Sequence, residues 1–373
     1  MKKFKKVLAI SLSLAMVLAF VAACAGDPEP TPAPEPEPAA EEPAAEPEPT
    51  PEPEDPPADP PAGVGDDPHV VLTYAEVNPI DSLMGSTAAE FKRLVEELSE
   101  GSITINIQAG GVLGQESDVL DGMMGGVGMV DMSRISAFGL TPFGAEYSTL
   151  LTIPFTFEGR DHFWAFADSD LAYETLMEPH NIGLGVRGLF YLEEGFRHFF
   201  TTSPIGGMED LAGLNLRVPG DPIMVGMVES IGATATTLSF TELYSGLSTG
   251  VVDGAEQPIV NYLANSFHEV APYMILNAHT LGAAQVIMTD EAWNRLTENQ
   301  QAVIMEAGRL ASAFNRNLSE QFENEAIEQL LEEGATFIPV DDVQQWRDAA
   351  ASVIAQFTAG FEERYQAILN MAN

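Results

Sequence analysis

The stretch GLNLRVPGDP, residues 213–222, places an arginine where it could bind an anion. Arg217 follows a short alternation of apolar residues and precedes Pro219, which would hold the end of a strand rigid. A guanidinium presents parallel N–H donors that match the two oxygens of a carboxylate. Arg217 could equally pair with an acidic neighbour, because the chain has 56 Asp and Glu residues against 16 Lys and Arg. The residues alone leave both interpretations open.

Motifs that would indicate an enzyme occur in the wrong structural context. GLGVRG (183–188) matches a dinucleotide-binding glycine pattern, but it lies within a predicted strand and begins no helix. GLSTG (246–250) matches a nucleophile motif, but Ser248 ends a predicted helix. Glu193 and Glu194 are adjacent and point to opposite faces of a strand unless a bulge intervenes. Since the histidines also lack metal-ligand spacing, we predict no catalytic site, metal or cofactor.

Strand and helix patterns alternate along residues 69–373. Apolar residues recur at every second position in SITINI (102–107) and along one face of GSTAAEFKRLVEELSEG (85–101). This alternation predicts an α/β fold with a parallel-type sheet that has helices on both faces. The other predicted strands are 70–75, 128–136, 182–192, 213–218, 233–237, 250–253 and 280–289, and the other predicted helices are 115–124, 160–178, 221–231, 239–248 and 257–265.

A helical pattern without proline runs from about residue 290 to residue 333. A helix of about 40 residues would measure roughly 60 Å, which suits a helix that braces two domains. We therefore predict a two-lobed periplasmic-binding-protein-like fold with a cleft between the lobes. Lobe I is predicted to comprise residues 69–194 plus 283–322, and lobe II residues 195–282 plus 323–373.

The N-terminus, residues 1–24, has the pattern of a secretory signal peptide. Lysines at positions 2, 3, 5 and 6 precede an apolar run that is too short for a stable membrane span. The last four residues, VAAC, resemble the lipobox of bacterial lipoproteins, and Cys24 is the only cysteine of the chain. The alternative is an incidental cysteine in an apolar segment. We predict lipidation at Cys24 and anchoring outside the cytoplasm, on the outer face of the cell membrane or in the periplasm.

Residues 25–68 are dominated by Pro, Glu and Ala and contain no Lys or Arg. Such a segment lacks the apolar surface that would offset the entropy of ordering, and its prolines favour extended polyproline II. We predict a disordered tether, with a docking segment for an SH3-like partner as the alternative. The net charge of −40 argues against nucleic acid or anionic membrane surfaces as partners. It is compatible with a salty habitat and equally with the composition of the lineage.

Several segments of residues 70–370 resemble the periplasmic binding subunit of TRAP transporters, the tripartite ATP-independent family that imports organic acids. The segments that carry the resemblance are DLAGLNLRVP (210–219), IGATATTLSFTELYSGLSTGVVDGAEQP (231–258) and HEVAPYMILNAHT (268–280). Their order and spacing together are specific. The resemblance implies that cleft closure captures an organic acid, which small and large membrane subunits then import with an ion gradient, commonly sodium. We expect a monomer whose contact with the membrane is the lipid anchor.

The resemblance also implies roles for individual residues. Arg217 matches the arginine that clamps the substrate carboxylate, and Arg197 matches a second arginine that faces the ligand. Phe240 matches an aromatic that packs on the ligand. Gln257 stands where many members have asparagine, which implies a different ligand size or pose. Phe240 could instead be only a core residue, and Gln257 only a helix N-terminal residue.

Further candidates lie in the first lobe. Asn78, or its neighbour Glu76, belongs to the first strand–helix loop, which lines the cleft in the family. Arg134, Ser136 and Phe138 match the wall of this lobe by position rather than by identity.

Ligand identity depends on what else lines the cleft. The aromatic candidates favour an aromatic or hydrophobic keto or amino acid, with a C4-dicarboxylate as the other possibility: Phe138, Phe190, Tyr191, Phe196, Phe199 and Phe240. A sugar acid would need more Asn, Asp and Gln side chains than the sequence pattern places there. Two other classes stay open, namely a ligand-sensing lipoprotein that partners a receptor kinase and a cell-surface hydrolase.

Overall fold

The computed structural model describes residue 61, residues 63–126 and residues 128–372. The predicted signal peptide, Cys24 and most of the predicted tether lie outside the described residues. The last residues of that tether are part of the folded body, because Val64 is fully buried in the core. Asp67 Oδ2 also accepts a 2.7 Å hydrogen bond from Thr297 Oγ1. The folded body therefore begins before residue 69, and the predicted end of the tether is too late.

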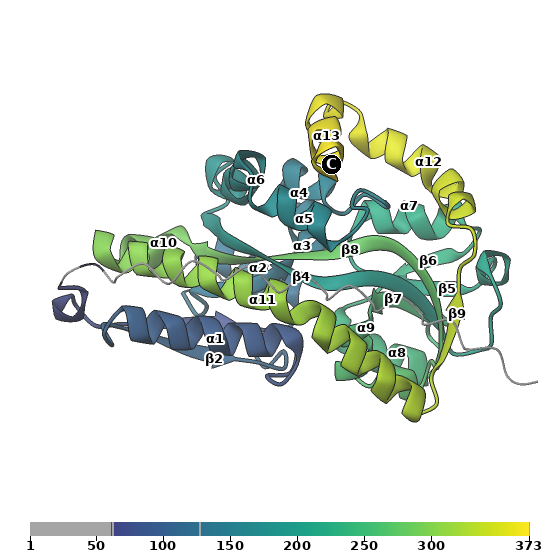
Figure 1. The fold of residues 1–373 in the computed structure, drawn as a ribbon, viewed down its shortest axis with the longest axis horizontal. Coiled ribbons are helices and arrows are strands. Elements are labelled where there is room, and N and C mark those ends of the chain that lie inside the picture. Colours follow the sequence, from purple (N-terminus) through teal and green to yellow (C-terminus); the bar gives the residue numbers. More distant parts are fainter. Residues whose placement is uncertain (1–60, 62, 127, 373) are drawn as a thin grey trace, which may run out of the picture. The chain divides into compact units, whose positions relative to one another are not determined.

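Nine strands in the described residues form one sheet in the order β2-β1-β3-β8-β4-β7-β5-β6, with β9 paired to β8 (Figure 1). Two of them, β4 and β8, are long and pair with each other along the centre of the sheet. The strands are β1 (Val70–Ala75), β2 (Ile103–Gln108), β3 (Met132–Ser136), β4 (Val186–Thr201), β5 (Asn215–Val218), β6 (Thr234–Thr237), β7 (Gly254–Pro258), β8 (Tyr273–Thr289) and β9 (Thr336–Pro339).

The sheet is mixed, which corrects the expectation of a parallel sheet. β1 pairs in parallel with β2 and β3, and β5 pairs in parallel with β6 and β7. The central strands β4 and β8 are antiparallel to each other and to their neighbours β7 and β3. Two parallel groups, each built from strands joined by helical connections, are thus linked by an antiparallel pair in the middle.

Helices cover this sheet. The helices are α1 (Leu83–Leu98), α2 (Glu116–Met124), α3 (Ala137–Leu140), α4 (Glu146–Leu150), α5 (Arg160–Ala167), α6 (Asp170–Asn181), α7 (Pro222–Ser230), α8 (Leu243–Ser248), α9 (Ile259–Ala264), α10 (Asp290–Asn294), α11 (Glu298–Glu332), α12 (Gln344–Thr358) and α13 (Glu362–Leu369). The single helix expected over 160–178 is two helices, because Ser169 is extended and caps α6 through its side chain. The strand expected over 250–253 begins instead at Gly254.

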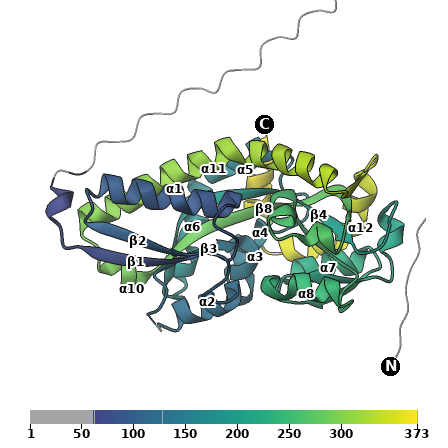
Figure 2. The same ribbon diagram turned by 90° about the horizontal axis from the view of Figure 1, so that it is seen from below.

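The long helix α11 packs against both parallel groups of strands and their helices. Its first half joins the core cluster that contains Phe91 of α1, and its second half joins the cluster that contains Tyr262 of α9. Figure 1 shows α11 passing from α1 toward α8 and α9, and Figure 2 shows α11 beside α1 on the same side of the sheet. Its 35 residues span about 52 Å at 1.5 Å per residue. It begins later than expected, because Thr297 and Gln300 form a capping box that separates α11 from α10.

The centre of the sheet is bulged and tightly packed. The register of β4 against β8 shifts between Glu193 and Phe196, where Gly195 has a φ of +85° that favours glycine. Gly282 of β8 faces this bulge, and a Cβ added there would lie 3.0 Å from the Gly195 carbonyl oxygen. Asn315 of α11 holds the same bulge, because its side chain accepts from the Glu193 N–H at 2.8 Å.

The C-terminal helices contact elements of both predicted lobes. α12 packs on α7 through Trp346 and Val353, and α13 lies against α5 and α6, where Ile368 O is 2.8 Å from His162 Nε2. α5 and α6 belong to the predicted lobe I, whereas residues 323–373 were assigned to lobe II. The lobe boundaries therefore stay a prediction.

Candidate ligand-binding site

A cavity of about 420 Å³ opens where the ends of several strands meet. On one side it is bordered by the loop after β1, by α2 and by the segment from β3 to α3. On the other side it is bordered by the ends of β5 and β6 and by the segment that leads into α8. The central strands β4 and β7 and helix α9 complete it. The lining residues are Val77, Asn78, Gln115, Glu116, Ser117, Arg134, Ser136, Phe138, Gly139, Pro142, Phe143, Glu194, Arg197, Arg217, Pro219, Gly220, Thr237, Leu238, Ser239, Phe240, Glu242, Gln257 and Asn261.

Nearly all the candidates from the sequence converge on this cavity. The lining contains Asn78, Arg134, Ser136, Phe138, Arg197, Arg217, Phe240 and Gln257. Glu76 does not line it. Its carboxylate lies behind the wall and accepts hydrogen bonds from Asn78 Nδ2 at 3.0 Å and from Arg134 Nη2 at 2.9 Å. Glu76 therefore positions cavity residues instead of facing the cavity itself.

Arg217 lies at the end of β5 with its guanidinium against the cavity. The residue is 3% exposed, and its Nε donates to the Leu238 carbonyl at 2.8 Å. It forms no salt bridge with any residue that the structure describes, and its two terminal nitrogens have no hydrogen-bond partner there. Burial lowers the pKa of Arg217 to about 10, since Glu256 only partly opposes this effect. The group is still protonated at neutral pH and has two N–H sites available for an anion.

Arg197 of β4 lines the same cavity but is already paired. Its Nε and Nη2 contact the two carboxylate oxygens of Glu256, the second at 2.9 Å, and its guanidinium lies 4.8 Å from the centre of the Phe138 ring. Although burial acts in the opposite direction, Arg197 and His279 lower the pKa of Glu256 to about 2. The pair is therefore ionised and close to neutral overall, and Arg197 has only Nη1 left for a ligand.

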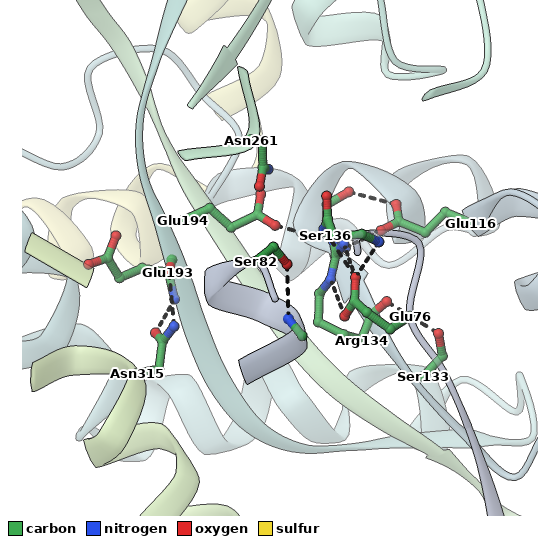
Figure 3. A network of polar contacts seen from close by, with 12 residues as sticks. Glu76, Ser82, Glu116, Ser133, Arg134, Ser136, Glu193, Glu194, Asn261 and Asn315 are labelled. Carbon is green, nitrogen blue, oxygen red and sulfur yellow. Dashed lines mark hydrogen bonds and ion pairs between the residues drawn. The ribbon is translucent and has the colours of Figure 1, made fainter. Parts of the chain in front are cut away.

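Arg134 of β3 is surrounded by three carboxylates (Figure 3). Its guanidinium contacts Glu76 at 2.9 Å, Glu116 at 3.0 Å and Glu194 at 3.4 Å. Burial would lower the pKa of Arg134, but the three carboxylates raise it well above its usual value. This cluster has one cation and three acidic groups, so the wall next to it is acidic.

Several lining residues were not predicted from the sequence, among them Glu116, Glu194 and Asn261. Glu116 accepts hydrogen bonds from Ser136 N at 2.9 Å and Ser136 Oγ at 2.8 Å, and so fixes the wall of the cavity. Glu194 Oε1 and Asn261 Oδ1 are buried atoms with no hydrogen-bond partner among the described residues. Burial raises the pKa of Glu194, although Arg134 and Arg197 oppose this effect. The bulge in β4, which the sequence does not reveal, directs Glu194 to the cavity.

The expectation of an aromatic wall is wrong for most of its members. Phe190 and Phe199 belong to core clusters, and Phe199 stacks on His279 at 4.5 Å. Tyr191 and Phe196, which also belong to β4, pack in a third core cluster that contains Phe163 of α5. Only Phe138 and Phe240 of the six candidates line the cavity. The lining instead contains four side-chain amides, from Asn78, Gln115, Gln257 and Asn261.

Residues 74–360 match the model of the bacterial extracellular solute-binding proteins, family 7. The chain belongs to this family. It is therefore the solute-binding subunit of a TRAP transporter, a family of binding proteins and not of enzymes, and every residue that lines the cavity falls within the match.

Individual relatives agree with this assignment. A solute-binding protein of Sulfitobacter sp. (strain NAS-14.1) is 28% identical over 66% of this chain and 74% of its own length. A TRAP periplasmic solute-binding protein from Pseudomonas putida F1, solved with bound D-glucuronate, is 29% identical with a TM-score of 0.77 over 80% of this chain and 96% of its own. A third, from Polaromonas sp. JS666 with bound D-erythronate, is 27% identical with a TM-score of 0.77 over 81% and 98%.

The structural similarity confirms the predicted fold class, a two-lobed α/β periplasmic-binding-protein-like architecture. Across residues 61, 63–126 and 128–372, no helix combines the length and apolar character needed to cross a bilayer. The same residues contain no group of three or more His, Cys, Asp or Glu side chains placed to hold a metal ion.

Proposed function

We propose that this protein captures a sugar acid, that is, a carboxylate with several hydroxyl groups, and delivers it to the membrane subunits of a TRAP permease. The observation that carries the proposal is the Arg217 guanidinium. It is buried against the cavity, protonated, and free of any acidic partner in the described part of the chain. A buried cation in this state gains a partner when a carboxylate enters, and bidentate pairing on Nη1 and Nη2 would be the strongest form of that contact.

The rest of the lining supports a hydroxylated ligand over an aromatic one. Hydroxyl groups need donors and acceptors, and the four amides, together with Ser136, Ser239 and Thr237, supply both. Phe138 and Phe240 can pack on the C–H face of a sugar. A volume of about 420 Å³ is in the range of small-molecule pockets. The D-glucuronate and D-erythronate found in the two similar structures are acids of this class.

Capture would proceed by closure of the cavity. The ligand would contact Arg217 on one side and residues such as Arg134 and Asn78 on the other, and so would stabilise the closed form over the open one. The closed complex would then be the species that the permease recognises. Lipidation at Cys24 would keep the protein near that permease.

The proposal is tested by isothermal titration calorimetry with D-glucuronate, D-galacturonate and D-erythronate. At least one of these acids should bind the wild-type protein, and Arg217→Lys should weaken that binding about 100-fold or more, because a single ammonium cannot reproduce the planar pair of donors. Arg93→Lys is the matched control. Arg93 is an exposed arginine on α1 that pairs with Glu90 and Glu97, so its replacement should leave the affinity unchanged. Near-normal affinity of Arg217→Lys would contradict the proposal.

A further inference from the structure

The two adjacent glutamates of β4 have different environments. Glu193 is fully partnered, since it contacts Arg160 Nε at 2.9 Å and the Gly195 N–H at 2.5 Å, and Asn315 binds its backbone. Glu194 lines the cavity, and its Oε1 accepts no hydrogen bond among the described residues, although Arg134 Nη1 lies 3.4 Å away as an ion pair. Figure 3 shows the two side chains leaving the strand in different directions. Hydrogen bonds within the fold therefore use the Glu193 carboxylate, whereas Glu194 pairs with Arg134 at longer range and keeps an acceptor at the cavity that no hydrogen bond uses.

Asn261 of α9 supplies a second unused acceptor. It is 3% exposed, lines the cavity, and its Oδ1 has no donor among the described residues. Helix α9 packs against β4, and Figure 3 shows Asn261 and Glu194 from these two elements. Buried polar atoms in folded proteins are nearly always satisfied, so a pair that is unsatisfied at a cavity indicates that a ligand completes them.

The chemistry of Glu194 Oε1 and Asn261 Oδ1 determines which ligand groups can bind there. Both are oxygens that accept hydrogen bonds, so the ligand must present donors there. A carboxylate would be repelled, because Glu194 lies beside Glu76 and Glu116 around the single cation Arg134. An apolar group would leave both oxygens without a donor. Hydroxyl groups meet the requirement without adding charge.

We infer that Glu194 and Asn261 form a hydroxyl-recognition subsite that selects polyhydroxylated acids and rejects a second carboxylate at that position. The inference rests on the proposed function, since it assumes that the ligand's acid group binds Arg217. It fixes the orientation of the ligand, with the acid end at Arg217 and the hydroxyl end at Glu194. It also distinguishes sugar acids from dicarboxylates and from hydrophobic acids of similar size.

The test compares two six-membered-ring acids, D-glucuronate and its hydroxyl-free counterpart cyclohexanecarboxylate, by calorimetry on wild type, Glu194→Gln and Asn261→Leu. Wild type should bind D-glucuronate at least tenfold more tightly than cyclohexanecarboxylate. The ratio of the two affinities should be at least fivefold smaller in each variant. Only the binding of D-glucuronate should weaken, and the binding of cyclohexanecarboxylate should stay the same. Glu194→Gln should also strengthen binding of succinate, because it removes the repelling charge. Glu194→Gln also removes the negative charge that pairs with Arg134 Nη1 at 3.4 Å, so the ligand-free variant should lose some stability, and the subsite is judged from the affinity ratio alone.

Glu193→Gln is the matched control, with the same substitution one residue away. It removes the charge that pairs with Arg160, so it should lower the unfolding temperature and leave the ratio unchanged. If the ratio is unchanged in both Glu194→Gln and Asn261→Leu while Arg217→Lys still abolishes binding, the subsite is wrong and the proposed function stands. If both acids weaken equally, the residues are structural and the subsite is also wrong. If none of D-glucuronate, D-galacturonate and D-erythronate binds the wild type, the proposed function fails and the subsite with it.

Discussion

The cavity has a buried arginine on each of two opposing walls, and the two have different partners. Arg134 contacts three carboxylates, whereas Arg217 contacts none in the described residues and donates only to a backbone carbonyl. Both are 3% exposed. Burial acts on both, yet the pKa of Arg134 is raised and that of Arg217 is lowered. The proposed role of Arg217 as a ligand clamp therefore rests on its missing acidic partner and not on its burial.

The difference also indicates how each wall contributes. The Arg134 cluster links the loop after β1 and the start of α2 to β3, through Glu76 and Glu116. Under the proposed function, the ligand carboxylate supplies the acidic partner that Arg217 lacks. We therefore expect the Arg134 wall to stabilise the ligand-free protein and the Arg217 wall to lower its stability.

The largest effect should follow loss of the partnered arginine. Arg134→Met leaves Glu76, Glu116 and Glu194 buried without their cation, and we expect the free energy of unfolding to fall by about 3–5 kcal/mol. Urea denaturation of the ligand-free protein measures this change. A loss below about 1 kcal/mol would mean that the three carboxylates are not held by Arg134, and the contrast between the walls would disappear.

The Arg217 wall has a buried carboxylate of its own, Asp221, which caps α7 through hydrogen bonds of 2.9 Å from Ile223 N and Met224 N. Burial raises the pKa of Asp221 to about 6, above its value in the unfolded chain. The proton is therefore held more tightly in the folded state, and the stability that it contributes below about pH 4 is lost as the pH rises through 6.

Asp221→Asn cannot titrate, so its stability relative to wild type should increase by about 2 kcal/mol between pH 4 and pH 7. Urea denaturation at a series of pH values measures this difference. The exposed Asp341→Asn serves as control and should show no comparable increase, because that side chain stays in water. A constant difference for Asp221→Asn would show that this carboxylate is paired after all, and that the two walls are more alike than the contacts indicate.

Replacing the unpaired arginine, Arg217, by methionine should change the free energy of unfolding in the direction opposite to Arg134→Met. Arg217→Met removes a buried charge that has no acidic partner, and it loses one hydrogen bond to Leu238 O. We expect the free energy of unfolding of the ligand-free protein to stay the same or rise by about 1 kcal/mol. A marked loss of stability would assign Arg217 a structural role like that of Arg134.

The smallest effect is expected at an exposed arginine. Arg93→Met removes ion pairs with Glu90 and Glu97 on the surface of α1, and exposed pairs of this kind contribute about 0.3 kcal/mol. Urea denaturation of the ligand-free protein also measures this change in the free energy of unfolding. A loss as large as that of Arg134→Met would show that burial does not explain the contrast between the two walls.

The sequence contained enough information to place much of the fold and the cavity. Arg217 could be found because a strand pattern, Pro219 and the family resemblance all pointed to the same position. Arg197 and Gln257 also reach the cavity, although Gln257 lies on β7 and not in a helix. The boundaries of the short strands and helices were less accurate, since single residues such as Ser169 and Thr297 decide where helices begin.

The interior of β4 could not be predicted in the same way. This strand is buried along almost its whole length, so hydrophobicity does not distinguish its two faces. Three register shifts interrupt the alternation of side chains as well. Phe190 and Phe199 were therefore expected in the cavity but lie in the core, and Glu194 was not expected there but lines it. The prediction of an aromatic or hydrophobic acid depended on these side chains and loses its support for the same reason.

The long central strands limit how the ligand specificity of this binding protein can be changed. β4 and β8 each pass through the middle of the sheet, and a Cβ added to Gly282 would lie 3.0 Å from the Gly195 carbonyl oxygen. A Cβ added to Gly195 would lie 2.4 Å from Glu323 Oε2 on α11. A chimera made by grafting half of another binding protein would have to cut both strands and rebuild that contact. New specificity is more accessible through replacement of individual cavity side chains, which leaves the shared backbone intact.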